Sequence, residues 1–467
     1  MSDLAFLGAV ELGRRIARRE LSSTEATRAM LERIERLDPK LRAYARVTAE
    51  LALAQAARAD AELKAGRSRG PLHGVPVAVK DLCDTAGITT AVGMPMFRDR
   101  RPERDATVVR RLEAAGAVLL GKLQLSEAAL ALHHPDIPLP VNPWRADLWT
   151  GSSSSGSGVA TAAGLCYAAI GSDTGGSIRF PSLANRLVGI KPTWGRVSRQ
   201  GVFALSWTLD HVGPMARSVE DAAALLGAVA GRDEEDPTTL AGPVPDYLGG
   251  LGGDLAGVRL GYDEPYATAG VRPDIVAAVE RAIAILRGCG AALVQVRMPP
   301  VKAAIAAWTP ICLAEAAASH AAQSLYPQRA AEYSASLREF LDAGLAVRGV
   351  DYANANLARR QFAGNLAQLF QGADLMIVPV TPSALPTVEA FARICPDAEG
   401  LERLIYFTCI YDVSGNPVIT LPAGMASDGT PLGLQLVARH GEEALLCRAG
   451  ARYLGELGSR ERPPLAA

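Results

Sequence analysis

The first 65 residues carry apolar side chains at the spacing of an amphipathic helix. Apolar residues recur at intervals of three and four from Met30 to Leu37, after a polar segment, residues 22–25, whose sequence Ser-Ser-Thr-Glu is typical of a helix N-cap. A second stretch, residues 48–64, is rich in alanine and carries its charges on one side. The pattern therefore predicts helices over residues 4–64 that wrap the body of the protein, without chemistry of their own.

Downstream, short apolar runs alternate with helical segments. Residues 74–79 form a β-branched run that ends on Lys80, and residues 115–122 indicate a helix end, a turn and a second strand, which makes a βαβ-like unit. Proline-rich residues 129–149 and polar residues 232–253 are expected to be loops. The same patterns predict further strands at residues 166–170, 188–191, 258–262, 291–297, 375–380, 414–424 and 433–437, and helices at residues 159–163, 273–287 and 303–370. The fold class predicted is α/β.

The composition is that of an ordinary globular protein, with 49% hydrophobic and 21% charged residues. The 48 basic and 49 acidic residues give a net charge of −1, so no field of one sign would attract nucleic acid or an anionic membrane. No apolar run approaches the length of a membrane span, and the first residues lack the pattern of a secretion signal. The seven cysteines include no Cys-x-x-Cys pair, which favours free thiols and a cytoplasmic location.

Two loops are rich in serine and glycine. Residues 151–158 have the sequence Gly-Ser-Ser-Ser-Ser-Gly-Ser-Gly, and residues 171–177 have the sequence Gly-Ser-Asp-Thr-Gly-Gly-Ser. Both lie at ends of predicted buried elements, where unpaired main-chain N–H groups can face a ligand. Such a run is more often a flexible linker, but the first loop is short and passes directly into apolar residues. A phosphate-binding loop is disfavoured because the sequence Gly-x-x-x-x-Gly-Lys-Ser/Thr is absent.

The residues available for catalysis favour a serine–lysine device over a serine–histidine one. There are six histidines, and neither loop contains the Gly-x-Ser-x-Gly turn of an α/β-hydrolase. A lysine at the end of a buried strand loses hydration, so the pKa of Lys80 should fall and its neutral amine could take a proton from a serine. Residues 174–177 would expose N–H groups around the Ser177 hydroxyl. His133 and His134 are adjacent but have no third ligand at a suitable spacing, so no metal is expected.

Several long motifs follow one another along the chain. They are residues 71–81 (PLHGVPVAVKD), 151–158 (GSSSSGSG), 171–181 (GSDTGGSIRFP), 189–193 (GIKPT), 209–215 (LDHVGPM), 415–417 (GNP) and 433–435 (GLQ). Through these motifs the sequence resembles the amidase signature family over nearly its whole length. The resemblance implies a single large α/β/α domain, residues 1–467, with a mixed central sheet covered by helices. Its parts would be an N-terminal helical wrap (1–65), the signature core (66–230) and the rest of the sheet (231–467), with a helical substrate-pocket region at about 303–370.

The resemblance also implies a Ser–cis-Ser–Lys triad. Lys80 matches the family's lysine, Ser177 matches its nucleophile, and Ser153, 24 positions earlier, matches the bridging serine. The peptide bond between Ser152 and Ser153 is then expected to be cis. Four main-chain N–H groups would form the oxyanion hole, those of Thr174, Gly175, Gly176 and Ser177. Two departures are Ser152, which replaces a glycine of the commonest motif, and residues 121–127, which differ from the usual Gly-Lys-Thr-Asn.

The expected function is hydrolysis of a carbon–nitrogen amide bond in a small or aryl amide, with carbamates and esters as further candidates. Ser177 would form the acyl-enzyme, Lys80 would act as base and Ser153 as proton relay, without a cofactor. The expected apolar pocket lining is Trp144, Trp308, Phe362 and Tyr406. Two alternatives stay open, the glutaminase subunit of a tRNA-dependent amidotransferase, which needs partner subunits, and a non-catalytic scaffold. The small-molecule amide is the one partner expected, and whether the chain forms a homodimer is open.

Overall fold

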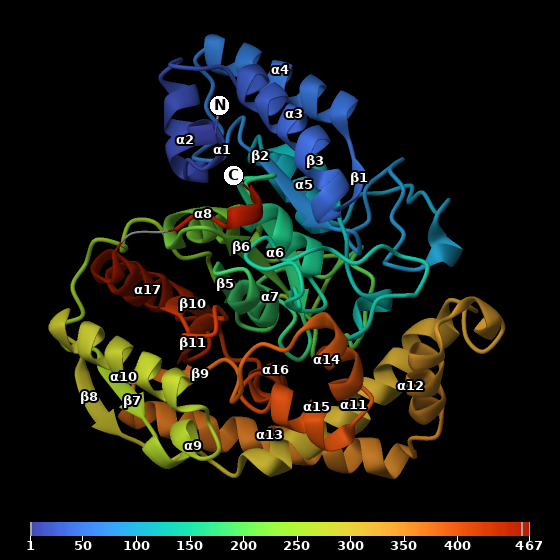
Figure 1. Ribbon diagram of the computed structural model, residues 1–467, viewed down its shortest axis with the longest axis vertical. Helices are drawn as coiled ribbons and strands as arrows, with labels where there is room; N and C mark the ends of the chain where they lie inside the picture. Colours follow the sequence, from blue (N-terminus) through green and yellow to red (C-terminus); the bar gives the residue numbers. More distant parts are fainter. Residues whose placement is uncertain (1, 459–460, 467) are drawn as a thin grey trace.

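One sheet of eleven strands runs through the protein and is covered by helices (Figure 1). The computed structural model describes residues 2–458 and 461–466. In their order across the sheet, the strands are β1 (Tyr44–Val47), β3 (Val118–Leu123), β2 (Pro76–Lys80), β4 (Ala168–Asp173), β6 (His211–Ala216), β5 (Val188–Lys191), β10 (Val418–Met425), β11 (Pro431–Ala438), β9 (Leu375–Pro379), β7 (Arg259–Tyr262) and β8 (Ala292–Gln295). The sheet is mixed, because β3, β2 and β4 are parallel, as are β9, β7 and β8, while β6, β5, β10 and β11 pair antiparallel.

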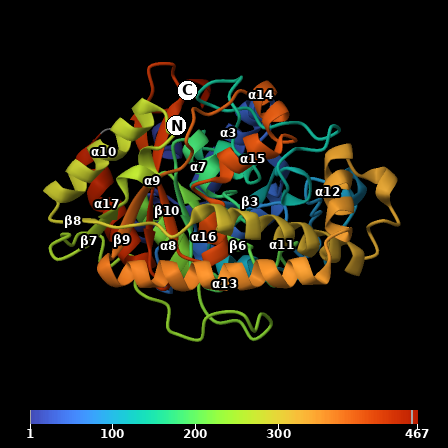
Figure 2. The ribbon, with the colours of Figure 1, turned by 90° about the horizontal axis from the view of Figure 1, so that it is seen from below.

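Helices pack on the sheet in groups. Helix α6 packs on β4, β6 and β2, and α7 packs on β10, β11 and β5. Helix α17 packs between α8 and α10. Helices α3 and α4 cover β2 and β3, whereas α11, α12, α13 and α16 pack on one another (Figure 2). The α-helices of the described residues are α1 (Ser2–Ala5), α2 (Ala9–Ala17), α3 (Ser23–Leu41), α4 (Ala49–Lys64), α5 (Thr107–Ala114), α6 (Ser155–Ala162), α7 (Arg179–Ala184), α8 (Val219–Val229), α9 (Glu264–Thr268), α10 (Pro273–Gly288), α11 (Val301–Ala322), α12 (Ala335–Leu345), α13 (Gly349–Gly372), α14 (Val388–Ile394), α15 (Ala398–Ile405), α16 (Cys409–Ser414) and α17 (Glu443–Leu457).

The centre of the sheet explains the apolar sequence of its strands. Every residue of β2, with the sequence Pro-Val-Ala-Val-Lys, is buried, and so is every residue of β4. A parallel strand that is covered on both faces needs a continuous apolar run rather than alternation. Because β2 and β4 are parallel, with Val79 opposite Ile170, their carboxyl ends meet at one edge. Lys80 ends one strand there, and Ser172 and Asp173 end the other.

Most of the predicted elements are confirmed. The capping box at Ser22 and Glu25 starts α3, and the βαβ-like unit and the strand–helix–strand of β7, α10 and β8 occur where predicted. Two strands were missed. The short edge strand β1 lies inside the region predicted as helical, and β6 contains Gly213 and Pro214, residues that argue against a central strand. The run at 303–370 is mostly helical, as predicted, and contains the three helices α11 to α13. The three-part division of the chain stays a prediction.

Helix α11 is the one described helix long and apolar enough to cross a membrane, with a mean hydropathy of 1.3 over its best window. However, 56% of that window is buried inside the protein, and α11 packs against α12, α13 and α16. It therefore has the character of a core helix. The seven cysteines are free thiols, and six of them are buried.

Candidate active site

The carboxyl ends of β2 and β4 bring Lys80 next to two serine hydroxyls. The Nζ of Lys80 lies 2.6 Å from the Oγ of Ser153 and 2.8 Å from the Oγ of Ser172. All three side chains are buried, and Lys80 is 0% exposed. The sequence pointed to Lys80 and Ser153 but not to Ser172.

The charge of Lys80 is poorly compensated in this position. Burial lowers the pKa of its ammonium to about 7, although the carboxylates of Asp210 and Asp173 act in the opposite direction. Within the described residues no carboxylate lies within 4 Å of its Nζ, whereas the neighbouring buried Lys122 lies 3.0 Å from a carboxylate oxygen of Asp81. Lys80 can therefore lose its proton near neutral pH.

The loop before α6 holds Ser153 against this amine. The Ser152–Ser153 peptide bond is cis, as expected. Gly151 has a φ of +79°, and a Cβ there would lie 2.4 Å from the backbone of Pro181, so only glycine fits. The N–H of Ser154 donates to the carbonyl of Ser177 at 3.3 Å, and its Oγ donates to the carbonyl of Ser172 at 3.1 Å. These bonds fasten the two serine-rich loops to each other.

The second loop, residues 173–179, is shaped by the carboxylate of Asp173. It accepts hydrogen bonds from the N–H groups of Gly176 (2.6 Å) and Ile178 (2.9 Å) and two from the guanidinium of Arg179 (3.0 and 2.8 Å). Arg179 also donates to Asp412 of α16 at 2.6 Å and to the carbonyl of Thr408 at 2.7 Å. The loop is thus tied to a segment more than 200 residues away in the sequence.

This cluster is entirely buried, so its charges must balance locally. Burial opposes the ionisation of Asp173, but the charge and hydrogen bonds of Arg179, together with the N–H of Ile178, outweigh it and hold the pKa of Asp173 well below its usual range. Likewise, Asp173 and Asp412 overcome the effect of burial and raise the pKa of Arg179. Burial raises the pKa of Asp412 itself well above its usual range, so Asp173 carries the main counter-charge of Arg179. A fully paired guanidinium at this position keeps the loop in one conformation.

Ser177 lies in this loop, is only partly buried and lines a cavity of about 240 Å³. Of the four N–H groups predicted as an oxyanion hole, that of Gly176 already donates to Asp173. Lys80 and Ser153 are joined directly by a hydrogen bond. The hydrogen bond that links Ser177 to the first serine-rich loop goes from the N–H of Ser154 to its main-chain carbonyl.

The cavity beside Ser177 is lined mainly by apolar and aromatic residues from distant parts of the chain. They are Ala129, Leu130, Ala131, Trp149, Ser152, Thr174, Gly175, Ser177, Phe180, Leu205, Trp308, Ser336, Glu339, Phe340, Phe391, Cys395, Pro396, Leu401, Leu404 and Ile405. Of the pocket residues expected from the sequence, Trp308 lies here and donates from its Nε1 to the carbonyl of Thr174 at 2.8 Å. The loop 129–149 and the helical region 303–370 both contribute to the lining, as expected.

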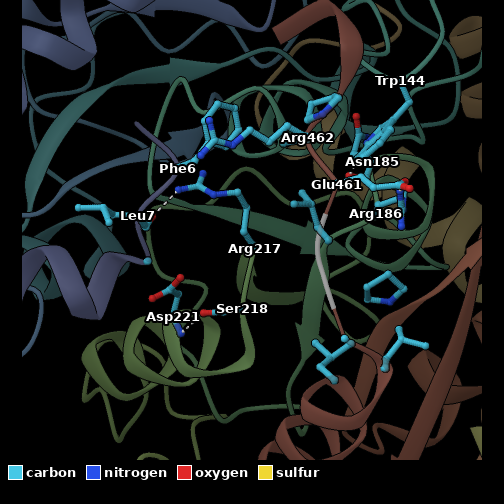
Figure 3. A pocket seen from close by; sticks show the side chains of 18 residues that line it. Phe6, Leu7, Trp144, Asn185, Arg186, Arg217, Ser218, Asp221, Glu461 and Arg462 are labelled. Atoms are coloured by element: carbon cyan, nitrogen blue, oxygen red, sulfur yellow. Dashed lines mark hydrogen bonds and ion pairs between the residues drawn. The ribbon is translucent and has the colours of Figure 1, made fainter. Parts of the chain in front are cut away.

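The other three expected lining residues lie elsewhere. Trp144 lines a separate cavity, where its ring stacks under the guanidinium of Arg186 near Asn185 (Figure 3). Phe362 is buried in α13, and Tyr406 packs against two other aromatic rings. Their sequence positions were compatible with a pocket, but tertiary packing places them outside this lining. Trp149, Phe180 and Phe391 line the cavity instead, and nothing in the local sequence distinguishes them from core residues.

No group of three or more potential metal ligands occurs among the residues that the structure describes. The Nε2 of His133 lies 3.1 Å from the Oγ of Ser155, and burial lowers the pKa of His133 to about 4. This histidine is therefore a neutral side chain of the loop 129–149 that hydrogen-bonds to Ser155 at the start of α6.

A buried lysine joined to one serine, with a second serine on an adjoining glycine-rich loop and an apolar cavity beyond it, is an arrangement suited to acyl transfer. The model of the amidase family matches residues 25–447, and the chain belongs to this family.

Relatives match over nearly their whole length. AmiD of Mycobacterium tuberculosis is 46% identical over 454 residues, which cover 96% of this chain and 94% of AmiD. A glutamyl-tRNA(Gln) amidotransferase component of Anaeromyxobacter dehalogenans is 39% identical over 490 residues, which cover 99% of this chain and 98% of that protein. Among solved structures, the native peptide amidase from Stenotrophomonas maltophilia is 33% identical and superposes with a TM-score of 0.84 over 99% of each chain. The family thus makes this protein an amidase that hydrolyses amide bonds.

Replacing Arg179 with Met is expected to lower the free energy of unfolding by about 3–5 kcal/mol, because it leaves Asp173 buried without its counter-charge. The change is measured by urea denaturation followed by circular dichroism. Arg14→Met, which removes an exposed ion pair with Glu220, serves as the control and should alter stability far less. Equal effects of the two substitutions would contradict the account of the buried cluster.

Proposed function

We propose that this protein hydrolyses small amides with an apolar or aryl acyl group through an acyl-enzyme on Ser177, with Lys80 as the base and Ser153 as the proton relay. The observation that carries the proposal is the position of Lys80. Its amine lies within 2.6 Å of Ser153, is fully buried and has a pKa of about 7. Such a lysine can lose its proton at neutral pH, which an exposed lysine cannot do.

The proton movements follow from the hydrogen bonds. With Ser172 accepting one N–H of the neutral amine, the lone pair of Lys80 is free to accept the proton of Ser153. Ser153 in turn takes the proton of Ser177 as the Oγ of Ser177 attacks the carbonyl carbon. When the carbon–nitrogen bond breaks, Ser153 gives a proton to the leaving amine and is reprotonated by Lys80. Water then attacks the ester in the same manner, and the carboxylic acid leaves.

The negative oxygen of the tetrahedral state needs donors that are not already engaged. The N–H groups of Thr174, Gly175 and Ser177 are the candidates that fit this need best, because that of Gly176 is held by Asp173. Two main-chain carbonyls of the same segment are also held by hydrogen bonds. That of Thr174 accepts from Trp308, and that of Gly175 accepts from the hydroxyl of Thr408 at 2.6 Å. The peptide planes of this segment are thus held before substrate arrives.

The volume and the lining of the cavity support a substrate with a small, apolar acyl group. A volume of about 240 Å³ exceeds the roughly 150 Å³ that accommodates a benzene ring in a protein interior. Its walls include Trp149, Phe180 and Phe391, with the Trp149 and Phe391 rings stacked at 4.2 Å between centroids. The name of the related peptide amidase agrees with an amide of moderate size as substrate.

The glutaminase subunit of an amidotransferase is the second candidate, because a component of such an enzyme is among the relatives. Free glutamine carries an α-carboxylate, which a protein site normally binds with an arginine or a lysine. Within the described residues, the lining of the Ser177 cavity contains no basic side chain. The described lining therefore offers no partner for a substrate carboxylate, which favours an amidase that acts on aryl or other small amides over a glutaminase.

Labelling with a fluorophosphonate tests the nucleophile. Mass spectrometry of the labelled protein should show one adduct on Ser177, and Ser177→Ala should remove it and lower turnover by about 10⁴–10⁶-fold. Turnover is followed on a panel of anilides, primary amides, carbamates and glutamine. Ser182→Ala is the control, since the hydroxyl of Ser182 only donates to the carbonyl of Ile178. Acylation that survives in Ser177→Ala would sink the proposal, and so would glutamine as the best substrate of the panel.

The pH dependence of kcat/KM reports the protonation of Lys80 in the free enzyme. Because the neutral amine is the reactive form and its pKa is about 7, the rate should rise with pH through neutrality and level off above about pH 8. Below about pH 6 the rate should fall roughly tenfold for each pH unit. Circular dichroism over the same range separates this effect from unfolding. A profile that stays flat down to about pH 4 would exclude Lys80 as the base.

A further inference from the structure

The Ser177 cavity has a distinctive distribution of charge. Among its 20 described lining residues, Glu339 is the one with a charged side chain. The described lining contains no lysine, arginine or histidine. Glu339 forms no ion pair within 4 Å with any described residue, unlike many other glutamates on the surface. A substrate in the cavity therefore meets a single negative group without a counter-charge.

Helix α12 holds Glu339 at this position. Ser336, Glu339 and Phe340 are spaced at three and four residues, which places them on one face of the helix, and all three line the cavity. Leu337 and Leu341 lie on the other side and are 1% and 0% exposed. Helix α12 also packs along α11, so its cavity face has a defined orientation.

The N-terminus of α12 is held too. The side chain of Ser334 accepts a hydrogen bond from the N–H of Leu337, and the N–H of Ser334 donates to a carboxylate oxygen of Glu127 at 3.1 Å. Glu127 is itself buried next to the loop that supplies Ala129 and Leu130 to the cavity. Glu339 therefore lies on an anchored helix rather than on a mobile loop.

The aromatic side chains of the cavity add to the attraction for positive charge. Trp149 lies between Phe180 and Phe391, with ring centroids 5.6 Å and 4.2 Å away, and Phe340 follows Glu339 in the lining. Aromatic faces carry negative electrostatic potential and bind ammonium groups. A carboxylate at the rim and aromatic rings in the walls together suit an organic cation.

We infer that the preferred substrates are amides whose acyl or amine part carries an ammonium group, and that Glu339 is the residue that selects them. This inference rests on the proposed hydrolysis at Ser177 and names the class of its substrate. The cation would sit between the carboxylate of Glu339 and the aromatic walls, with the amide carbonyl at Ser177. An anionic substrate would be repelled by the same carboxylate.

Three aryl amides test the inference if they differ in a single para substituent, which is trimethylammonium, tert-butyl or carboxylate. The first two have nearly the same shape, so the ratio of their kcat/KM values isolates the charge. For the wild type, we expect the ratio of cationic to neutral substrate to be about three to ten, and the carboxylate to be the poorest substrate. High salt should reduce this ratio, because Glu339 is exposed.

Glu339→Gln keeps the size of the side chain and should bring the ratio close to one. Glu280→Gln, which removes an exposed carboxylate from α10, is the matched control and should keep the wild-type ratio. An unchanged ratio in Glu339→Gln, or the carboxylate as the best substrate, overturns the inference. If the tert-butyl amide is cleaved in a Ser177-dependent manner while the ratio is insensitive to Glu339, the inference fails and the proposed function stands. If the fluorophosphonate does not label Ser177 and none of the three amides is cleaved, the proposed function itself fails.

Discussion

The burial of Lys80 without a carboxylate partner is the constraint on which the site depends. A lysine loses a large hydration energy when it is buried, and a protein usually compensates this loss with a counter-charge, as Asp81 does for Lys122 one strand away. At Lys80 the compensation consists of two neutral hydroxyls, those of Ser153 and Ser172. The proton is therefore held weakly, which lowers the pKa of the amine and makes it available as a base near pH 7.

In the buried cluster around Arg179, by contrast with Lys80, the positive charge is paired with a carboxylate. Its guanidinium donates to Asp173, Asp412 and the carbonyl of Thr408, so its charge is paired and its proton does not move. The two groups lie on neighbouring segments, because Asp173 directly follows Ser172 in β4. The paired charges of Asp173 and Arg179 fix the shape of the loop that contains Ser177. Lys80, which has no carboxylate partner among the described residues, is the group that can exchange a proton. Both features depend on the register of β2 and β4, because a slip of one residue would turn Lys80 to the other face of the sheet.

The sequence alone was sufficient to predict those parts of the site that belong to contiguous segments of the chain. The apolar run that ends on Lys80 and the two glycine–serine loops are contiguous segments, so their elements could be predicted. The sequence was not sufficient to predict contacts between side chains that are far apart along the chain. Asp412 lies 233 residues from Arg179, and no local pattern marks it. Likewise Trp144 and Phe362 are aromatic residues in the expected regions, but which side of a loop or helix faces the cavity is decided by tertiary packing. The missed strand β6 pairs on both sides despite its glycine and proline, because tertiary pairing outweighs weak strand propensity.

In this protein, many of the residues that contact a substrate in the cavity differ from the residues that carry out hydrolysis. The reacting groups lie on β2, β4 and the serine loops, whereas much of the cavity wall comes from the loop at 129–131, from α11 and α12 and from residues 391–405. A change in the walls alters neither the hydration of Lys80 nor the pairing of Arg179. The net charge of −1 says nothing about the field that a substrate meets, because that field is set by side chains within about a Debye length of the amide carbonyl. A single carboxylate among aromatic walls is therefore enough to set the charge preference of the cavity while leaving the hydrolytic machinery unchanged.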